Sequence, residues 1–215
     1  MFDSNKRFQV MILSGGEKRC LLRYPTDGEW IEAARKRRFV RRQLGRNKSQ
    51  TSAVGFEQAA AELFAKVRAD QDGEAFDEAE AAAAVMKLEL VEAVECAREG
   101  DGFRVVLRCF IGQVEHEGST VDAYQRVVHR LRIPFQADVL AYRRAAVPDA
   151  IEERGMATQH MLLEPAGTLW DKIGRAEAGY EPDSAVPITH KDAAVSSLLL
   201  QMGALAAGQD LDPES

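Results

Sequence analysis

The amino-acid sequence predicts an α+β fold with an internal duplication of a unit made of a β-hairpin and three helices, the two copies packed in pseudo-symmetry. Two observations lead to this prediction. Four short stretches recur in the same order at offsets of about 95 to 110 residues, and each half places alternating, strand-like segments before apolar residues at helical spacing. We therefore expect a first unit over residues 1–99 and a second over residues 100–215.

The recurring stretches are short, but their order is the same in both halves. They pair Phe8–Ile12 with Phe103–Leu107, Leu22–Pro25 with Leu131–Pro134, Leu63–Val67 with Leu169–Ile173, and Ala83–Val85 with Ala193–Val195. The alternative is that helices rich in Ala and Leu resemble one another by composition alone. If the duplication holds, features common to both copies indicate the fold, and features of one copy are candidates for function.

The first unit opens with a predicted hairpin and a helix. Arg7–Leu13 and Lys18–Tyr24 alternate around the turn 14–17, which is typical of paired strands. Thr26 and Glu29 have the spacing of a capping box, in which each residue bonds a free backbone N–H of the other. This box predicts a helix over 27–44, ended by Gly45 and followed by a polar loop to Val54.

Two more helices complete the first unit. Apolar residues at helical spacing predict one over 56–69, and Asp77 is placed to cap the other. Residues 88–97 fit two structures: a helix that continues to about residue 90, or a strand that forms a hairpin with Phe103–Phe110. We favour the helix and leave 91–97 open.

The second unit follows the same plan with fourteen more residues between its first two strands. We expect strands at Phe103–Phe110 and Tyr124–Ile133, and a helix over 136–146 that Pro148 ends. Two further helices are expected over 169–175 and 189–207, with an extended connector over 180–189 between them. An acidic tail follows over 208–215.

Composition limits the class of protein. The chain is 46% hydrophobic and 29% charged, as in soluble globular proteins. No apolar run approaches the ~20 residues that a bilayer-spanning helix needs, and the first residues lack an apolar signal core. We therefore expect a cytoplasmic protein. Three widely spaced cysteines, Cys20, Cys96 and Cys109, fit neither a disulfide framework nor a zinc site and are expected as buried small residues.

The strongest local signal is a basic segment over residues 35–48. It holds eight positive charges and no acid, in a chain of net charge −6, and the second half has no counterpart. These are Arg35, Lys36, Arg37, Arg38, Arg41, Arg42, Arg46 and Lys48. Arginine forks suit anionic partners, so we expect Arg35, Arg38, Arg42, Arg46 and Lys48 to bind a partner.

Helical geometry would divide the arginines of this segment into two groups. Arg35, Arg38 and Arg42 fall opposite the apolar stripe, and Arg37 and Arg41 fall within it. We expect the latter two to be structural and to meet acids between Asp70 and Glu80. Three alternatives remain for the basic segment: internal pairing with the acidic stretch 49–100, nucleic acid, or an anionic membrane surface.

Catalytic, metal and cofactor signatures are missing from the sequence. Glu115-His116-Glu117 has no second histidine nearby, and the spacing of Ser119, Asp122 and His129 does not suggest a triad. His129 lies in a predicted strand and is expected as a hydrogen-bonded core residue. We expect no cofactor, no metal site and no enzyme activity, although an unrecognised active site stays an alternative.

One stretch carries a resemblance to a known class of proteins. Tyr24-Pro25-Thr26-Asp27-Gly28-Glu29-Trp30, followed by the Arg-rich segment and Gln43-Leu44-Gly45-Arg46, resembles uncharacterised proteins encoded in phage and prophage structural-gene clusters. The resemblance extends loosely to Gly179-Tyr180 and Val186–Lys191. Some such proteins are taken to act in tail or particle assembly, so the resemblance implies a binding protein and supplies no catalytic residues.

The functional expectation is therefore a non-catalytic assembly or interaction protein, of a phage or phage-like particle, with protein partners. It would be cytoplasmic or incorporated in a virion. The alternative is a nucleic-acid-binding accessory protein that uses the basic segment 35–48. The sequence leaves the partner and the oligomeric state open.

Overall fold

The computed structural model describes the chain except for residues 14–16, 46–47, 146–155, 161–162 and 207–215. It confirms the α+β class. The described strands are β1 (Arg7–Leu13), β2 (Glu17–Arg23), β3 (Arg38–Gly45), β4 (Lys48–Val54), β5 (Val91–Glu99), β6 (Gly102–His116), β7 (Ser119–Arg132), β8 (Met156–His160) and β9 (Gly174–Ala178). The described helices are α1 (Asp27–Lys36), α2 (Phe56–Val67), α3 (Glu78–Leu88), α4 (Gln136–Ala145), α5 (Leu163–Ile173) and α6 (Ile188–Ala206).

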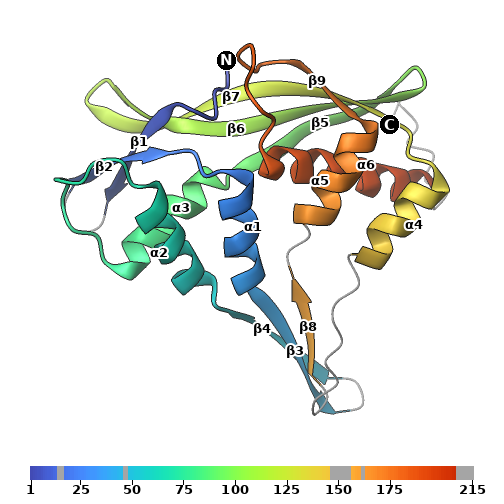
Figure 1. Ribbon diagram of the computed structural model, residues 1–215, viewed down its shortest axis with the longest axis horizontal. Coiled ribbons are helices and arrows are strands. Elements are labelled where there is room, and N and C mark those ends of the chain that lie inside the picture. Colours follow the sequence, from blue (N-terminus) through green and yellow to red (C-terminus); the bar gives the residue numbers. More distant parts are fainter. Residues whose placement is uncertain (14–16, 46–47, 146–155, 161–162, 207–215) are drawn as a thin grey trace.

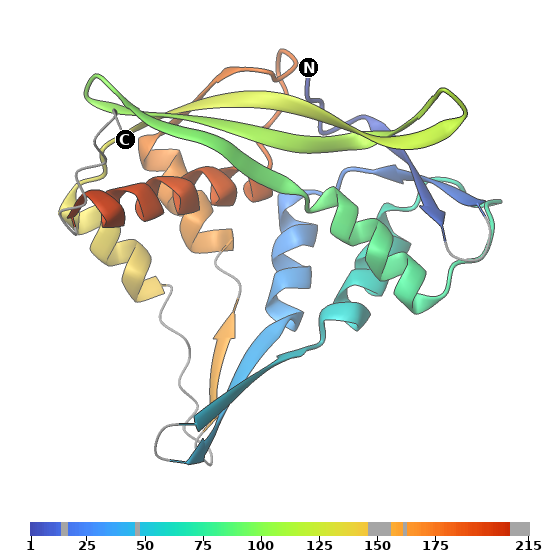
Figure 2. The same cartoon turned by 180° about the vertical axis from the view of Figure 1, so that it is seen from behind.

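The strands form three antiparallel sheets, ordered β1-β2, β4-β3-β8 and β5-β6-β7-β9. Figure 1 shows the four-stranded sheet spread along one side of the molecule, with helices beneath it on a single face. Figure 2 shows the same two layers from behind, with α3 and α6 directly under the sheet. The hairpin β1-β2 lies between one end of this sheet and the helices α1 and α2.

Both halves of the chain contribute to one continuous hydrophobic core. Leu22 and Trp30 come from the first half, Leu107 and Leu198 from the second, and all four are almost completely buried. Strand β5, from the first half, pairs with β6 from the second. The two hairpins belong to separate sheets but share this core, since β1 packs against β6. The proposed units are therefore parts of one packed body.

The two predicted helix starts are confirmed. Thr26 and Glu29 form a capping box at α1, where the Glu29 carboxylate accepts from the Thr26 backbone N–H at 2.8 Å. Asp77 and Glu80 form a second box at α3. Such boxes satisfy two backbone donors that a helix end leaves free.

The predicted helix 27–44 is wrong in its second half. Helix α1 ends at Lys36, and Arg37 has extended backbone angles (φ −90°, ψ 127°). Residues 38–45 form β3, and the predicted loop 45–54 becomes β4, which pairs with it. Strand β8, more than a hundred residues later in the chain, pairs with the other side of β3. Backbone pairing on both sides prevails over helical propensity, which is a weak constraint.

Other boundaries also differ from the expectation. Helix α3 ends at Leu88, and the segment left open at 91–97 is strand β5. Helix α5 begins at Leu163, six residues before the expected start, and ends at Ile173, two residues early, because β9 begins at Gly174 and pairs with β7. Strand β8 was not predicted. The turn at 14–16, the helix end at Pro148 and the tail 208–215 lie outside the described residues.

In the described ranges each half has a hairpin, a ten-residue helix and two further helices in this order, but the strands between the helices differ. The first half has β3 and β4 before α2 and ends in β5, whereas the second has β8 before α5 and β9 before α6. The pairing within the two hairpins agrees in detail. Phe8 pairs with Leu22 in the first hairpin, and their sequence counterparts Phe103 and Leu131 pair in the second. Leu22 also bridges Arg68, just after α2, and Leu131 bridges Gly174, just after α5.

Candidate functional sites: a basic arm and an interior pocket

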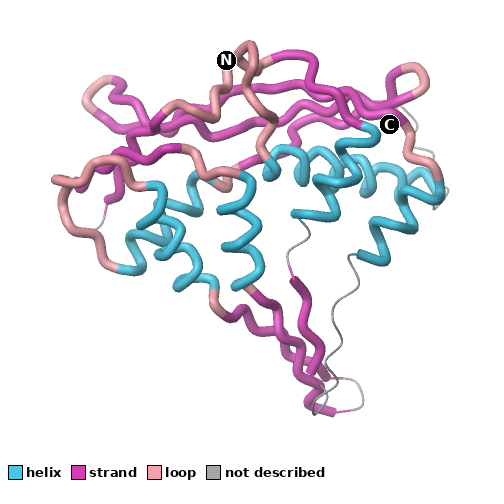
Figure 3. Tube along the Cα trace, in the orientation of Figure 1, coloured by secondary structure: helices cyan, strands magenta, loops and turns pink. Residues whose placement is uncertain are grey.

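The sheet β4-β3-β8 projects from the body as a narrow arm. Figure 1 and Figure 3 show its strands extending from the end of α1, away from the four-stranded sheet. We call residues 38–54 with β8 the arm. In β4 the side chains described as exposed are those of Gln50, Ser52, Ala53 and Val54. The arm is therefore an extension of the body toward solvent.

The arm carries most of the basic segment. Residues 38–54 contain five cations and no acid, namely Arg38, Arg41, Arg42, Arg46 and Lys48. Because residues alternate between the faces of a strand, positions 38 and 42 of β3 share one face and position 41 lies on the other. Lys48 is the first residue of β4, and Arg46 lies outside the described residues. The prediction that Arg35, Arg38 and Arg42 share one face of a helix is wrong, because α1 ends at Lys36 and positions 38 and 42 lie on a strand.

A glycine forms the base of the arm. Gly55 connects β4 to α2 with φ +74°, a conformation that favours glycine. A Cβ added there would overlap the backbone carbonyl oxygen of Lys36, the last residue of α1. The two ends of the β3–β4 hairpin are thus in contact where they leave the body.

The first cations of the basic segment bind acids of the body. Arg35, exposed at the end of α1, donates to both carboxylate oxygens of Glu164 at 2.9 and 3.0 Å. Lys36 pairs with Glu32 and Glu62. Arg35 was expected to be free for a partner, and in the structure it links α1 to α5 instead.

Arg37 is buried, as expected, but with a different acid. Its Nη1 pairs with Glu89, which follows α3, and its guanidinium lies over the Phe56 ring at 5.8 Å. The expected partners lay between Asp70 and Glu80. Of these, Asp70 pairs with Arg68 and Glu80 with Lys18. The side chain of Arg41 lies outside the described ones.

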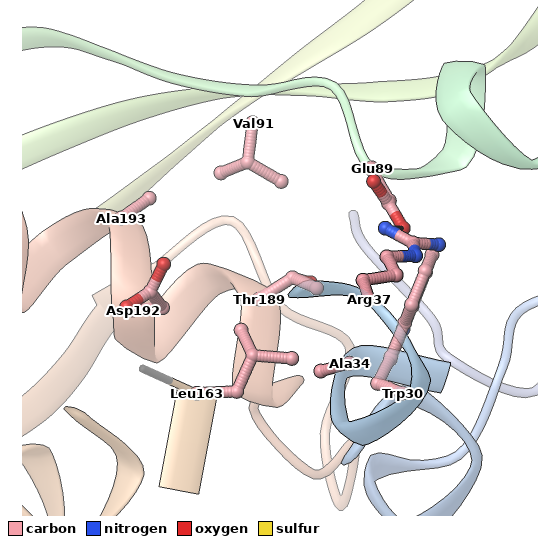
Figure 4. Close-up of a pocket in the computed structure, with 9 residues that line it drawn as sticks. All are labelled: Trp30, Ala34, Arg37, Glu89, Val91, Leu163, Thr189, Asp192 and Ala193. Carbon is pink, nitrogen blue, oxygen red and sulfur yellow. Dashed lines mark ion pairs between the residues drawn. The ribbon is translucent and has the colours of Figure 1, made fainter. Parts of the chain in front are cut away.

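Arg37 lines a cavity of about 190 Å³ between α1, β5, α5 and α6. Figure 4 shows Arg37 and Glu89 on one side and Asp192 on the other, with Val91 and Leu163 between them. The residues that line it are Trp30, Ala34, Arg37, Glu89, Val91, Leu163, Thr189, Asp192 and Ala193. We call this cavity the interior pocket.

The polar groups of the interior pocket are incompletely paired. Trp30 Nε1, Arg37 Nε and Arg37 Nη2 are buried and find no hydrogen-bond partner among the residues that the structure describes. Burial raises the pKa of Asp192 to about 6. Burial also raises the pKa of Glu89, against the opposing effect of Arg37. Unpaired buried donors cost about 1–3 kcal/mol each, so this arrangement needs an explanation beyond packing.

A second buried polar cluster is almost fully paired. Trp170 Nε1–H donates to Nδ1 of His129 at 3.0 Å, so His129 Nε2–H donates to the Tyr180 hydroxyl at 2.7 Å. Tyr180 then donates to His190 Nδ1 at 3.0 Å. Burial lowers the pKa of His129 to about 4 and that of His190 to about 3. The prediction of a hydrogen-bonded core His129 is confirmed, and this cluster serves packing.

No group of three or more potential metal ligands gathers within the described residues. His116 and Glu117 are exposed at the tip of the β6–β7 hairpin, and Arg19 pairs with Glu115. The three cysteines are free, two of them buried, and burial raises the pKa of all three thiols.

Comparisons with protein-family models, with curated proteins and with solved structures found no match to this chain. Among the helices that the structure describes, none has the length and apolarity needed to cross a bilayer. The charge pattern of the sequence indicated the basic residues of the arm. It did not indicate the interior pocket, whose polar residues come from three separate parts of the chain, at positions 30 and 37, at 89 and at 192.

Proposed function

We propose that the protein is a non-catalytic interaction protein that acts in the assembly of a larger particle and contacts a protein partner through its basic arm. The projection of the arm carries this proposal. It holds five cations and no acid over residues 38–54 in a chain of net charge −6, and its strands extend away from the four-stranded sheet (Figure 3).

The pairing of the other cations supports a partner role for the arm. Arg35, Lys36 and Arg37 already bind acids of the body. We assign the partner contact to Arg38, Arg42, Arg46 and Lys48. Rows of like charge on one surface raise the association rate with an oppositely charged surface and select against wrong partners. The expected partner therefore presents an acidic surface.

We propose that the particle is a phage or a phage-like one. The protein would act in the cytoplasm or be incorporated in the virion. This part rests on the resemblance of residues 24–30 and 43–46 to proteins of phage structural-gene clusters.

We further propose that the two halves arose by duplication of one hairpin-and-helices unit, residues 1–99 and 100–215. The equivalent pairs Phe8–Leu22 and Phe103–Leu131, and the equivalent bridges after α2 and α5, support it. The basic hairpin belongs to the first copy alone among the described ranges, as expected of a functional addition. An experimental structure in which residues 8–97 and 103–207 fail to superpose would remove this proposal.

A second candidate is a nucleic-acid-binding accessory protein. The specific observation is that the cations lie on an antiparallel hairpin, and the major groove of DNA admits a two-stranded β-ribbon. Binding through phosphates would fall steeply with salt.

The test compares two double charge reversals. Arg38→Glu with Arg42→Glu alters the arm, and Arg143→Glu with Arg144→Glu alters exposed cations of α4 by the same net charge. Each tagged protein is used to capture partners from extract of the native host, with and without nuclease treatment, followed by mass spectrometry. We expect virion or tail proteins with the wild type and the α4 variant, and their loss with the arm variant.

Two other outcomes decide against the first proposal. If capture depends on the arm and disappears with nuclease, while the protein binds random-sequence duplex DNA with a strong salt dependence, the nucleic-acid candidate holds. If both double variants capture the same partners as the wild type, the arm is not the contact surface.

A further inference from the structure

The interior pocket differs from the other buried polar cluster in one respect. Around His129 and Tyr180, successive hydrogen bonds pair the side chains, and His190 Nε2 is the one buried atom of that cluster without a partner in the described structure. In the interior pocket three N–H donors and two carboxylates, Glu89 and Asp192, surround a cavity, and the donors have no partner in the described structure. Evolution rarely retains such groups without something that satisfies them.

The free atoms of Arg37 form a fork. Nη1 is held by Glu89, which leaves Nε and Nη2, the two nitrogens on the adjoining edge of the guanidinium. Two parallel N–H groups on one edge match the two oxygens of a carboxylate. The ion pair to Glu89 and the Phe56 ring on its face hold the guanidinium in place. Trp30 Nε1 adds a third donor on the same side of the pocket (Figure 4).

Asp192 defines the other end of the pocket. It lies across from Arg37 in Figure 4, at the start of α6. A plain carboxylate ligand would add a negative charge to a pocket that already holds the Glu89 and Asp192 carboxylates, and it would leave Asp192 without a cation. A ligand that also carries an ammonium group would pair with Asp192 and offset the desolvation of this partly buried carboxylate. Complementarity at both ends therefore requires a zwitterion.

The walls and size of the pocket limit the rest of the ligand. Ala34, Val91, Leu163 and Ala193 provide apolar surface between the two polar ends. A cavity of about 150 Å³ with apolar walls holds one benzene molecule, and this one measures about 190 Å³. The pocket thus has room for a ligand of about ten non-hydrogen atoms.

We propose that the interior pocket binds a small apolar amino acid, with its carboxylate on Arg37 and Trp30 and its ammonium group on Asp192. This site lies within the body between residues of both halves, so it does not depend on the role of the arm. Bound ligand would join α1 to α6 and stabilise the packing of the two halves against each other.

The experiment is isothermal titration calorimetry of the full chain with glycine, L-valine, L-leucine and L-phenylalanine. L-Leucine is compared with 4-methylpentanoate, which lacks its amine, and with 3-methylbutylamine, which lacks its carboxylate. We expect saturable binding of at least one amino acid, and at least about ten-fold weaker binding of either single-charge analogue, since hydrogen bonds to charged groups contribute about 1.5–3 kcal/mol.

Three variants locate the site. Trp30→Phe keeps an aromatic side chain and removes the indole N–H donor. Asp192→Asn keeps the shape of the side chain and removes its charge. Asp171→Asn, an exposed acid of α5 paired with Lys191, is the matched control. We expect weaker amino-acid binding with the first two and unchanged binding with the control, each variant being checked as folded by circular dichroism.

Asp192→Asn should also bind 4-methylpentanoate at least as tightly as the wild type does, because the repelling charge is gone. No saturable binding of any of the four amino acids to folded protein would overturn the proposal, and so would binding that Trp30→Phe and Asp192→Asn leave unchanged.

Discussion

The body and the arm are built by different means. In the body, residues of both halves fill one core, and buried side chains such as Leu131 and Val195 have no exposed surface. In the arm, the described side chains of β4 are exposed, and what the structure shows holding its strands is backbone pairing of β3 to β4 and β8. Because the two regions are held by different interactions, we expect changes in the arm to leave the core of the body folded.

The largest contrast is expected from one truncation in each region. Leu131→Ala in β7 removes a fully buried side chain and should cost about 2–5 kcal/mol of unfolding free energy. Val54→Ala, at the base of the arm with half its surface exposed, should change it by less than about 0.5 kcal/mol. Urea unfolding followed by circular dichroism measures both. Comparable losses would mean that the arm is packed like the body.

Acid should destabilise the body through its histidines. The folded-state pKa of His129 is lowered to about 4 from an ordinary 6.5, so below pH 6.5 the unfolded chain takes up the proton first. Stability is therefore present above pH 6.5 and is lost as the pH falls toward 4, by about 3 kcal/mol for such a shift. Unfolding free energies at pH 7 and pH 4.5 test this.

Protonation of Asp192 has the opposite effect on the stability of the protein over the same pH range. Its pKa is raised to about 6 from an ordinary 3.8, so the folded state takes up this proton first and gains stability as the pH falls from about 6 to 4. Asp192→Asn removes that gain. The variant should be more stable than the wild type at pH 7 and should lose more stability between pH 7 and pH 4.5. Equal losses would show that Asp192 titrates normally.

The junction of arm and body depends on Gly55. Gly55→Ala should cost about 1–3 kcal/mol, because it combines a positive φ with overlap against the carbonyl oxygen of Lys36. Gly28→Ala is the matched control: nothing lies within 4 Å of its added Cβ, and α1 should gain up to about 1 kcal/mol from alanine. Thermal melts of the two variants should shift in opposite directions.

The smallest effect is expected on the surface of the arm. Arg38→Glu with Arg42→Glu should change the unfolding free energy by about 0–1 kcal/mol, the usual range for surface charges. Chemical denaturation measures it. Unfolding of this double variant would indicate that these two arginines hold the arm to the body.

Local signals predicted much of the body. Thr26, Asp77 and the alternation in Arg7–Leu13 each act within a few residues, so the sequence alone located two helix starts and the first hairpin. The α+β class followed from them. Residues matched between the two halves in the sequence are also paired in the same way in the two hairpins. Common descent of the halves stays a proposal.

The arm and the interior pocket depend on residues far apart in the chain. Residues 38–44 have apolar spacing that suits a helix, but they form a strand that pairs with β4 on one side and with the distant β8 on the other. Helix α1 ends at Lys36, and the next residue, Arg37, pairs with Glu89, which follows α3. Trp30 and Asp192 come together with them through the packing of α1 against α6. Charge pattern identified the basic residues, but their geometry required the tertiary structure.

The central claim is that the arm is a separable contact surface on an independent body. Arg38 pairs with Val54, so residues 39–53 can be replaced by Asn-Gly, the favoured two-residue hairpin turn. Thermal unfolding and partner capture are then measured on the same preparation. We expect a cooperative melt within a few degrees of the wild type and loss of the captured proteins. An unfolded protein would show that the arm belongs to the core fold, and a folded protein that still captures the same partners would contradict the claim.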